Sequence, residues 1–269
     1  MTDHLLETVA DGVATLTMNR PEARNALTGE MQAALTEAVN RLALDPDVRV
    51  VVLTGTGAAF CAGGDVKGFA ADAGRGADGK GGPSLEQRSA GLRAGMEVVK
   101  RLHDMPKPTL AVIPGPAAGA GLSLALACDL RISTNTAKLT TAFSKVGLAG
   151  DYGGSYFLTH LIGAAKTREL YFSADVITGE EALALGIVNK SVPAEELPAA
   201  AAAYAKYLAG LPTVAIGYMK RNLNTAAHAT LSEVLDTEAL HMVRTMMTDD
   251  HKAAAQAFVD KRAPVFLGR

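Results

Sequence analysis

Two glycine-rich segments are the first candidates for chemistry, because both could place backbone N–H groups around an anion. One runs Phe60-Cys61-Ala62-Gly63-Gly64-Asp65, and the other runs Gly115-Pro116-Ala117-Ala118-Gly119-Ala120-Gly121. Each follows a predicted strand, and the second leads into a predicted helix whose first N–H groups have no intrahelical partner. Together the segments are expected to hold an anion, whereas either one alone could simply turn the chain between packed elements.

Other catalytic patterns are absent or incomplete in the sequence. There is no Gly-x-x-x-x-Gly-Lys-Ser/Thr phosphate loop, and Gly55-x-Gly57 lacks the third glycine of a dinucleotide fingerprint. Ser123 falls one residue short of a Gly-x-Ser-x-Gly nucleophile elbow, but it lies inside an apolar predicted helix and is expected to be structural. The 6 histidines show no ligand spacing, so no metal site is predicted.

The elements that must position these segments alternate between strand and helix. Thr28 is predicted to cap a helix whose apolar positions Met31, Leu35, Val39 and Leu42 share one face. Strands are predicted over residues 13–18, 48–53, 109–113, 130–133 and 189–192, and helices over 85–103, 119–127 and two stretches within 164–185. No strand is predicted after residue 192, so an α/β core over residues 1–195 and a helical region over 196–269 are expected.

Composition and charge exclude several classes of partner. Lys and Arg number 26 and Asp and Glu number 28, and this net charge of −2 favours neither nucleic acid nor an anionic membrane. Residues 108–128 are uncharged, but Pro114, Gly115 and Pro116 would break a membrane-spanning helix. With 2 cysteines and no basic region followed by an apolar one at the N-terminus, a cytoplasmic location is expected. The glycine-rich stretch 70–84 has little to bury and is predicted to be a mobile lid.

Several motifs in order resemble the crotonase (enoyl-CoA hydratase/isomerase) superfamily. They are Arg20-Pro21-Glu22-Ala23-Arg24-Asn25-Ala26-Leu27, the two glycine-rich segments, Cys128-Asp129 and the closing Lys261-Arg262-Ala263-Pro264-Val265-Phe266. The resemblance implies a spiral of ββα units whose helical C-terminal region builds homotrimers, often paired into hexamers. It also implies an acyl-CoA thioester substrate, of which coenzyme A is a part, and no separate cofactor.

The resemblance also assigns site residues. It makes the backbone N–H groups of Ala62 and Ala120 an oxyanion hole, which would stabilise the enolate of a thioester. It places Gly63, Gly64, Asp65 and Phe143 at the substrate. Arg24 is expected to contact the phosphates of coenzyme A, the alternative being an exposed arginine before a helix.

The reaction must be inferred from the acid–base positions. The two glutamates of hydratases correspond to Ser123 and Phe143, neither of which can activate water, so hydration is disfavoured. The stretch from Ala142 to Gly154 is similar to the branch that isomerises ring-epoxidised phenylacetyl-CoA and shifts enoyl-CoA double bonds, in which Asp151 would be the acid–base. The alternative for Asp151 is the N-cap of a helix beginning near Tyr152.

An isomerase is therefore favoured, with an enoyl-CoA hydratase (lyase) of fatty-acid β-oxidation as the alternative. A dienoyl-CoA isomerase is disfavoured because such enzymes resemble this chain at Asp151 but add acids where it has Ser123 and Phe143. An aryl-CoA dehalogenase is disfavoured because the sequence contains no Trp. A non-catalytic scaffold or RNA-binding member of the fold is disfavoured by the near-neutral charge and the intact glycine-rich segments.

Overall fold

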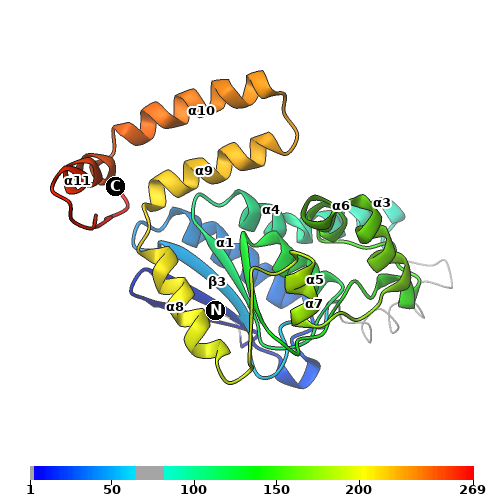
Figure 1. Ribbon diagram of the computed structural model, residues 1–269. Helices are drawn as coiled ribbons and strands as arrows, with labels where there is room; N and C mark the ends of the chain where they lie inside the picture. Colours follow the sequence, from blue (N-terminus) through cyan, green and yellow to red (C-terminus); the bar gives the residue numbers. More distant parts are fainter. Residues whose placement is uncertain (1–2, 65–81) are drawn as a thin grey trace.

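A twisted, mostly parallel sheet forms the centre of the protein (Figure 1). The computed structural model describes residues 3–64 and 82–269. Within these residues the sheet has the strand order β1-β2-β3-β4-β6-β8, with β1 antiparallel to β2 and the other neighbours parallel. The strands are β1 (Leu5–Ala10), β2 (Val13–Met18), β3 (Val50–Gly55), β4 (Thr109–Ile113), β6 (Leu130–Thr134) and β8 (Lys190–Val192).

Helices cover both faces of this sheet, which explains why its central strands are apolar on both sides. Every residue of β4 is buried, as is typical of a strand between two helical layers. One layer contains α1 (Gly29–Leu44), α4 (Glu97–Asp104) and α5 (Ala120–Ala127), and the other is α8 (Leu197–Ala209). Since α8 packs on the sheet, the core extends beyond residue 195, and the projecting part of the chain begins after α8.

The remaining elements are short or peripheral. A second, two-stranded sheet pairs β5 (Ala117–Ala118) with β7 (Leu139–Thr140) in parallel. The others are η1 (Pro21–Ala23), α3 (Leu85–Gly95), η2 (Phe143–Val146), α6 (Gly154–Ser173), α7 (Gly179–Ala184), α9 (Thr213–Ala226), α10 (Leu231–Met246) and α11 (Asp249–Val259).

Most predicted elements are confirmed, with three differences. Thr28 caps α1 as expected, its hydroxyl accepting from the Met31 N–H, and the stretch 108–128 forms β4, β5 and the fully buried α5. The helix predicted over 85–103 is divided between α3 and α4 at Met96, directly after Gly95. Strands β1, β5 and β7 were not predicted. Helix α6 begins at Gly154, before the predicted stretch, and is broken at Gly163, where φ is 76°. In the described part of the chain, no helix is long and apolar enough to span a membrane.

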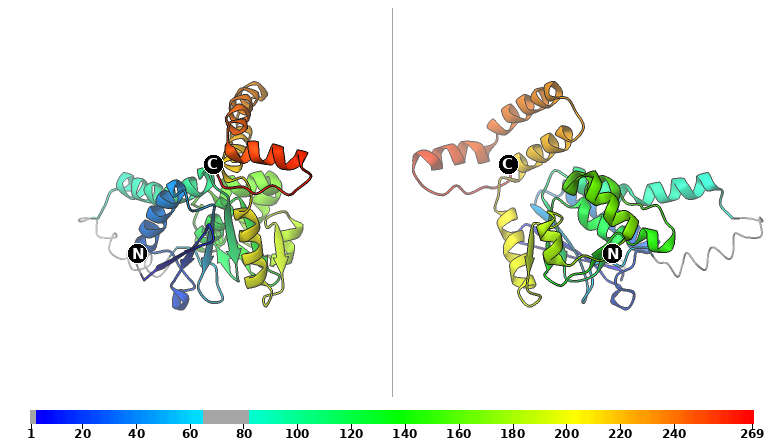
Figure 2. Two further views of the ribbon diagram at one scale, coloured as in Figure 1. Left: turned by 90° about the vertical axis from the view of Figure 1, so that its left-hand side faces the viewer. Right: turned by 45° about the vertical axis from the view of Figure 1, so that its right-hand side comes forward.

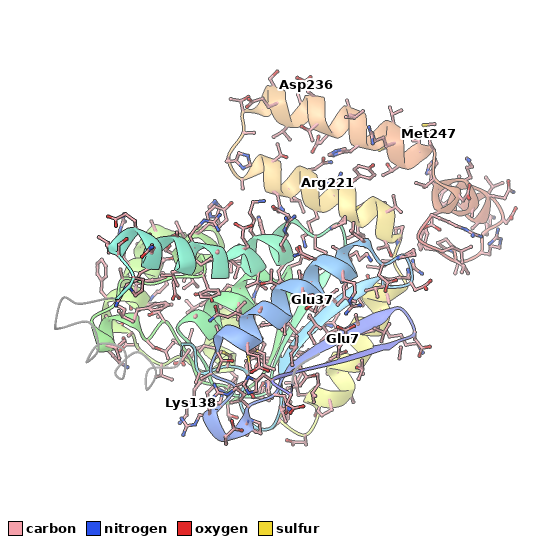
Figure 3. All side chains as sticks on the ribbon, turned by 180° about the vertical axis from the view of Figure 1, so that it is seen from behind. Glu7, Glu37, Lys138, Arg221, Asp236 and Met247 are labelled. Atoms are coloured by element: carbon pink, nitrogen blue, oxygen red, sulfur yellow. The ribbon has the colours of Figure 1, made fainter. Side chains whose placement is uncertain are left out.

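Helices α9 to α11 project from the core as an arm (Figure 2). Lys220 anchors α9 to the core, because its Nζ donates to the carbonyl of Leu102 (2.9 Å) and to the carboxylate of Asp129 (2.8 Å). No residue of α10 is buried, and the arm carries Arg221, Asp236 and Met247 away from the sheet (Figure 3).

A first prediction concerns the close contact between α5 and residue 61. A Cβ added to Gly121 would lie 2.3 Å from the carbonyl oxygen of Cys61. Gly121→Ala is therefore expected to destabilise the protein by about 1–3 kcal/mol in urea unfolding, because backbone must move to make room. The matched control is Gly91→Ala in α3, where a Cβ meets nothing within 4 Å and a gain of about 0.5–1 kcal/mol is expected. Equal stability of the two variants would contradict this account.

Candidate active site

The two glycine-rich segments lie against each other, as the sequence predicted. The Ala118 N–H donates to the carbonyl of Cys61 (3.0 Å), and the Phe60 N–H donates to the carbonyl of Pro116 (3.0 Å). A Cβ on Gly115 would lie 2.0 Å from the carbonyl oxygen of Ala58, so this approach requires glycine. The backbone that follows β3 is thereby held beside the start of α5.

Ala120 offers an unpaired backbone donor at this junction. It is the first residue of α5, after the N-cap Gly119 with φ 52°, and no side chain caps the helix. The N–H of a first helical residue has no intrahelical partner, and none is found for Ala120 among the described residues. A Cβ on Gly63 would lie 3.4 Å from the Ala120 nitrogen, so the two segments meet at this donor.

The expectation for Ala62 needs correction. Its N–H is already engaged, because it donates to the carbonyl oxygen of Arg24 (2.9 Å). The peptide between Gly63 and Gly64 has its carbonyl on the side of Leu27. Gly63 has φ 93°, and its carbonyl accepts from the Leu27 N–H (2.8 Å). In a trans peptide the N–H points opposite to the carbonyl, so the Gly64 N–H points away from Leu27. It points toward the side of the segment on which the Ala118 N–H donates to the Cys61 carbonyl. Gly64 therefore replaces Ala62 as the second candidate donor.

Asp151 does not cap the helix that follows it. The N-cap of α6 is Gly153, with φ 73°, and no side chain caps this helix. The Oδ1 atom of Asp151 is buried without a hydrogen-bond partner among the described residues. Burial raises the pKa of this carboxyl above its ordinary range. A desolvated carboxyl without a partner is a suitable group for taking and returning a proton.

Phe143 lies close to both Gly119 and Gly150, the residues that precede Ala120 and Asp151. An ideal Cβ at Gly119 would lie 3.5 Å from the Phe143 ring, and one at Gly150 would also lie 3.5 Å from it. The ring is 7% exposed and stacks on Tyr171 with 6.0 Å between centroids. The space between the residues that precede Ala120 and Asp151 is thus filled by an aromatic, apolar side chain.

Two further polar side chains, those of Ser123 and Tyr171, lie close to Gly154. Ser123 is buried in α5 and its hydroxyl donates to the carbonyl of Gly119 (3.2 Å), which agrees with the structural role predicted for it. A Cβ on Gly154 would lie 2.4 Å from the Ser123 Oγ and 2.6 Å from the Tyr171 hydroxyl. Burial and the charge of Asp151 raise the pKa of Tyr171 to about 12, so its phenol stays protonated. Tyr171 had no signal in the sequence, because only the tertiary fold brings it here.

Arg24 lines a separate cleft of about 470 Å³, which opens beside the second glycine-rich segment. The residue is exposed, has φ 50°, and shares the cleft with Lys138, which is labelled in Figure 3. Two cations that line one cleft suit a phosphate-bearing group. The sequence had indicated Arg24 but not Lys138. Asp65, as well as residues 70–81 of the predicted lid, lie outside the described residues.

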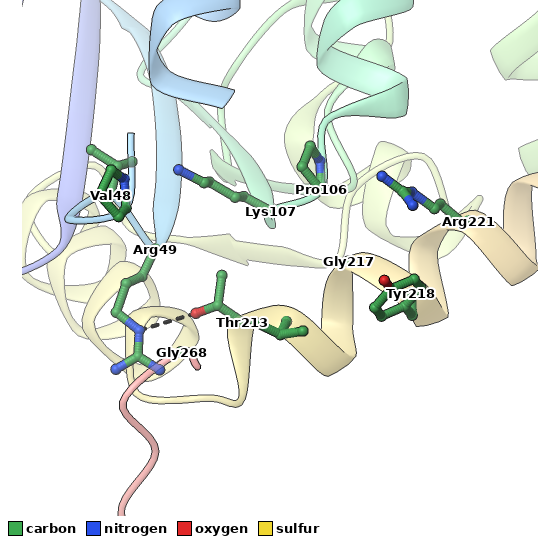
Figure 4. Close-up of a pocket in the computed structure, with 11 residues that line it drawn as sticks. Val48, Arg49, Pro106, Lys107, Thr213, Gly217, Tyr218, Arg221 and Gly268 are labelled. Carbon is green, nitrogen blue, oxygen red and sulfur yellow. Dashed lines mark hydrogen bonds between the residues drawn. The ribbon is translucent and has the colours of Figure 1, made fainter. Parts of the chain in front are cut away.

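A different cavity, of about 250 Å³, lies between the core and α9 (Figure 4). Two of its cations are hydrogen-bonded to protein: Arg49 donates to Thr213 Oγ1 (3.0 Å) and to the carbonyl of Phe266 (2.7 Å), and Lys107 donates to the carbonyl of Leu42 (2.7 Å). None of its lining residues belongs to the site around Asp151. Among the described residues, no group of three or more His, Cys, Asp or Glu side chains is arranged to hold a metal ion.

Comparisons with known proteins identify the family of the chain. A family model described as enoyl-CoA hydratase/isomerase matches residues 8–269. The chain is 35% identical over 269 residues to the 1,2-epoxyphenylacetyl-CoA isomerase of Escherichia coli strain K12, with 100% of both chains covered. It is 34% identical to a probable enoyl-CoA hydratase of Rhodobacter capsulatus, over 97% of this chain and 96% of that protein. The solved structure of an enoyl-CoA hydratase from Polaromonas sp. JS666 matches with a TM-score of 0.89 and 34% identity, over 97% of this chain and 99% of that one. The chain therefore has the crotonase fold and belongs to the enoyl-CoA hydratase/isomerase family.

Proposed function

We propose that the protein is an acyl-CoA isomerase in which Asp151 moves a proton while two backbone donors hold the thioester enolate. The observation that carries this proposal is the buried, unpartnered carboxylate oxygen of Asp151, combined with the lack of a carboxylate at positions 123 and 143. A proton shift needs one acid–base group, whereas hydration also needs a positioned and activated water. The apolar wall formed by Phe143 disfavours such a water.

The proposed reaction shifts a double bond of a 3-enoyl-CoA. Asp151 takes a proton from carbon 2, and the electron pair of that C–H bond moves into the thioester to give a dienolate. The N–H groups of Gly64 and Ala120 would donate to the negatively charged oxygen. Asp151 then returns the proton to carbon 4, which forms the 2-enoyl-CoA and restores the carboxylate.

Coenzyme A is proposed to enter as part of the substrate, with no separate cofactor. Arg24 and Lys138, which share one cleft, would bind its phosphates. The name of the isomerase relative suggests 1,2-epoxyphenylacetyl-CoA as a second substrate to test. The aromatic side chains of Phe143 and Tyr171 would suit a cyclic acyl group.

The proposal is tested by supplying 3-enoyl-CoA and 2-enoyl-CoA separately to the purified protein. We expect conversion of the first to 2-enoyl-CoA and slow or no hydration of the second. Rapid hydration of 2-enoyl-CoA without any shift of 3-enoyl-CoA would instead support the hydratase alternative, which the name of the Rhodobacter relative favours.

A second prediction concerns the pH dependence of turnover. Proton removal requires the Asp151 carboxylate, and burial raises the pKa of this group. The midpoint of the acidic limb of kcat/KM is therefore expected at a pH above about 3.9, the ordinary pKa of Asp. Activity is expected to rise as the pH increases through this limb. A limb at or below that ordinary value would show that the group in use is an exposed carboxylate and not Asp151.

We also propose that the arm of helices α9 to α11 joins subunits into a homotrimer or a hexamer. Exposed apolar residues of this arm include Leu223 at 72%, Leu231 at 74% and Met242 at 59%. A largely apolar groove of about 490 Å³ lies at the base of the arm and includes Met219 and Leu223. Large contiguous apolar surfaces of this kind mark contacts between proteins. Analytical ultracentrifugation is expected to show a trimer or hexamer, and a monomer at micromolar concentration would refute this assembly.

A further inference from the structure

Asn25 is a buried polar residue that the proposed chemistry does not use. It is 0% exposed and has φ 57°, a left-handed conformation that asparagine tolerates better than most residues. Its Oδ1 accepts from the Arg20 N–H (2.9 Å). Its Nδ2 donates to the carbonyl of Thr56 (3.0 Å) and to the carbonyl of Ala59 (2.9 Å). The amide thus ties the loop after β3 to the turn around residues 20–26.

The backbone around Asn25 contacts the segment that carries the Gly64 donor. Three hydrogen bonds connect these stretches: Ala62 N–H to the Arg24 carbonyl (2.9 Å), Cys61 Sγ to the Asn25 carbonyl (3.0 Å) and Leu27 N–H to the Gly63 carbonyl (2.8 Å). The last of them orients the peptide between Gly63 and Gly64. Residues 24–27 therefore act as a template for the donor segment.

The Asn25 amide is closely packed against the backbone of the loop after β3. A Cβ on Gly55 would lie 2.5 Å from Asn25 Nδ2 and 2.4 Å from the Ala59 carbonyl oxygen. The amide therefore fills a space that exists only because residue 55 is glycine. Without the amide, the carbonyls of Thr56 and Ala59 would lose a donor in a buried place.

We infer that Asn25 is a positioning residue for the oxyanion hole: its side-chain amide holds the loop after β3 against residues 24–27 and so aims the Gly64 N–H at the thioester oxygen. This inference rests on the proposed function, which makes Gly64 a donor of the hole. Asn25 itself touches no reacting atom. A small displacement of such a donor is costly, because a misplacement of about 1 Å can reduce the rate ~100-fold.

The test separates enolate binding from binding of coenzyme A. The variant is Asn25→Gly, because glycine adopts φ 57° without strain and only the side chain is lost. The probe is acetoacetyl-CoA, whose enolate is detected by its near-ultraviolet absorbance and requires the hole but no turnover. We expect enolate affinity and kcat to fall by about 10- to 100-fold, with the affinity for free coenzyme A and the KM of substrate nearly unchanged.

The matched control is Asn189→Gly. Asn189 also makes a long-range side-chain bond, accepting from the Arg131 N–H (2.8 Å), but it lies at the β8 edge of the sheet, away from the loop after β3. The control is expected to keep the enolate affinity of the parent. If Asn25→Gly binds the enolate as tightly as this control, or loses enolate and coenzyme A binding in equal measure, Asn25 has no positioning role.

The outcomes distinguish this inference from the proposed function. A parent protein that binds coenzyme A but captures no enolate would overturn the hole itself. A parent that captures the enolate, together with an Asn25→Gly variant that does so equally well, would overturn only the role of Asn25.

Two further measurements apply if Asn25→Gly does not fold. Asn25→Asp keeps the shape and the acceptor for the Arg20 N–H but replaces the amide donor, and unchanged enolate affinity in it would overturn the inference. In the parent, we expect slow hydrogen exchange of the Ala62 and Leu27 amides, because both donate hydrogen bonds between residues 24–27 and the donor segment. Exchange at the rate of exposed loops would contradict it.

Discussion

Replacement of Asp151 by Asn is expected to lower the kcat of isomerisation by about 10²- to 10⁴-fold. Asparagine keeps the size of the side chain but cannot take a proton. Because Oδ1 of Asp151 has no hydrogen-bond partner among the described residues, no neighbouring group is held in place to act as a substitute base. The measurement is steady-state turnover of 3-enoyl-CoA, with the affinity for coenzyme A determined in parallel.

Two comparisons make the Asp151 result decisive. Asp175→Asn removes an exposed carboxylate after α6 and is expected to leave turnover unchanged. The stability of Asp151→Asn is expected to equal or exceed that of the parent at neutral pH. Folding raises the pKa of the Asp151 carboxyl, so the free energy of unfolding of the parent falls as the pH rises from the pKa of the unfolded state to that of the folded state. Asparagine carries no charge, so the variant does not lose this stability. If turnover of Asp151→Asn stays within a few-fold of the parent, Asp151 is not the acid–base.

Replacement of Ala120 by Pro is expected to lower kcat by about 10²- to 10³-fold, because it deletes one donor of the oxyanion hole. Proline is tolerated at the first position of a helix, where the N–H has no intrahelical partner. Ala120 occupies this position in α5. The substitution therefore removes the N–H while the helix can remain, and the added ring also enters the space of the oxyanion.

The matched control for Ala120→Pro is Gly29→Pro. Gly29 is the first residue of α1 after its N-cap Thr28, and a Cβ there meets nothing within 4 Å. This control is expected to keep both fold and activity. Thermal unfolding of both variants shows whether they are folded. A folded Ala120→Pro protein with the turnover of the control would exclude the Ala120 N–H from the hole.

Local patterns in the sequence were sufficient to predict β4 and α5, two of the elements that position the site. Strand β4 and helix α5 are buried on all sides, so their apolar runs and the Pro/Gly turn between them gave a clear signal. Strand β1 gave none, because only Leu5 of its residues is buried and its order comes from pairing with β2. The break between α3 and α4 follows Gly95, where a Cβ would lie 2.9 Å from Gln32 Oε1. That contact with α1 has no local signature.

The candidate site was predicted only to the level of the segment. The sequence indicated residues 60–65 as a donor segment, but the direction of each N–H depends on the φ of 93° at Gly63. That conformation makes Gly64 the candidate donor in place of Ala62, whose N–H donates to the Arg24 carbonyl. The stacking of Phe143 on Tyr171 joins η2 to α6 and depends on tertiary packing. For Asp151 the sequence left two roles open, an acid–base and a helix N-cap, and the N-cap role is excluded only by the backbone, in which Gly153 takes that place.

The most direct test of a single-carboxylate proton shift follows one hydrogen through the reaction. A 3-enoyl-CoA carrying deuterium at carbon 2 is converted in ordinary water, and the 2-enoyl-CoA formed at early conversion is examined by mass spectrometry and NMR. Because the Asp151 carboxylate oxygen that lacks a partner is buried, the account predicts that part of the deuterium appears at carbon 4. Product with no deuterium at carbon 4 even in the first turnovers, or a 3-hydroxyacyl-CoA as the main product, would contradict it.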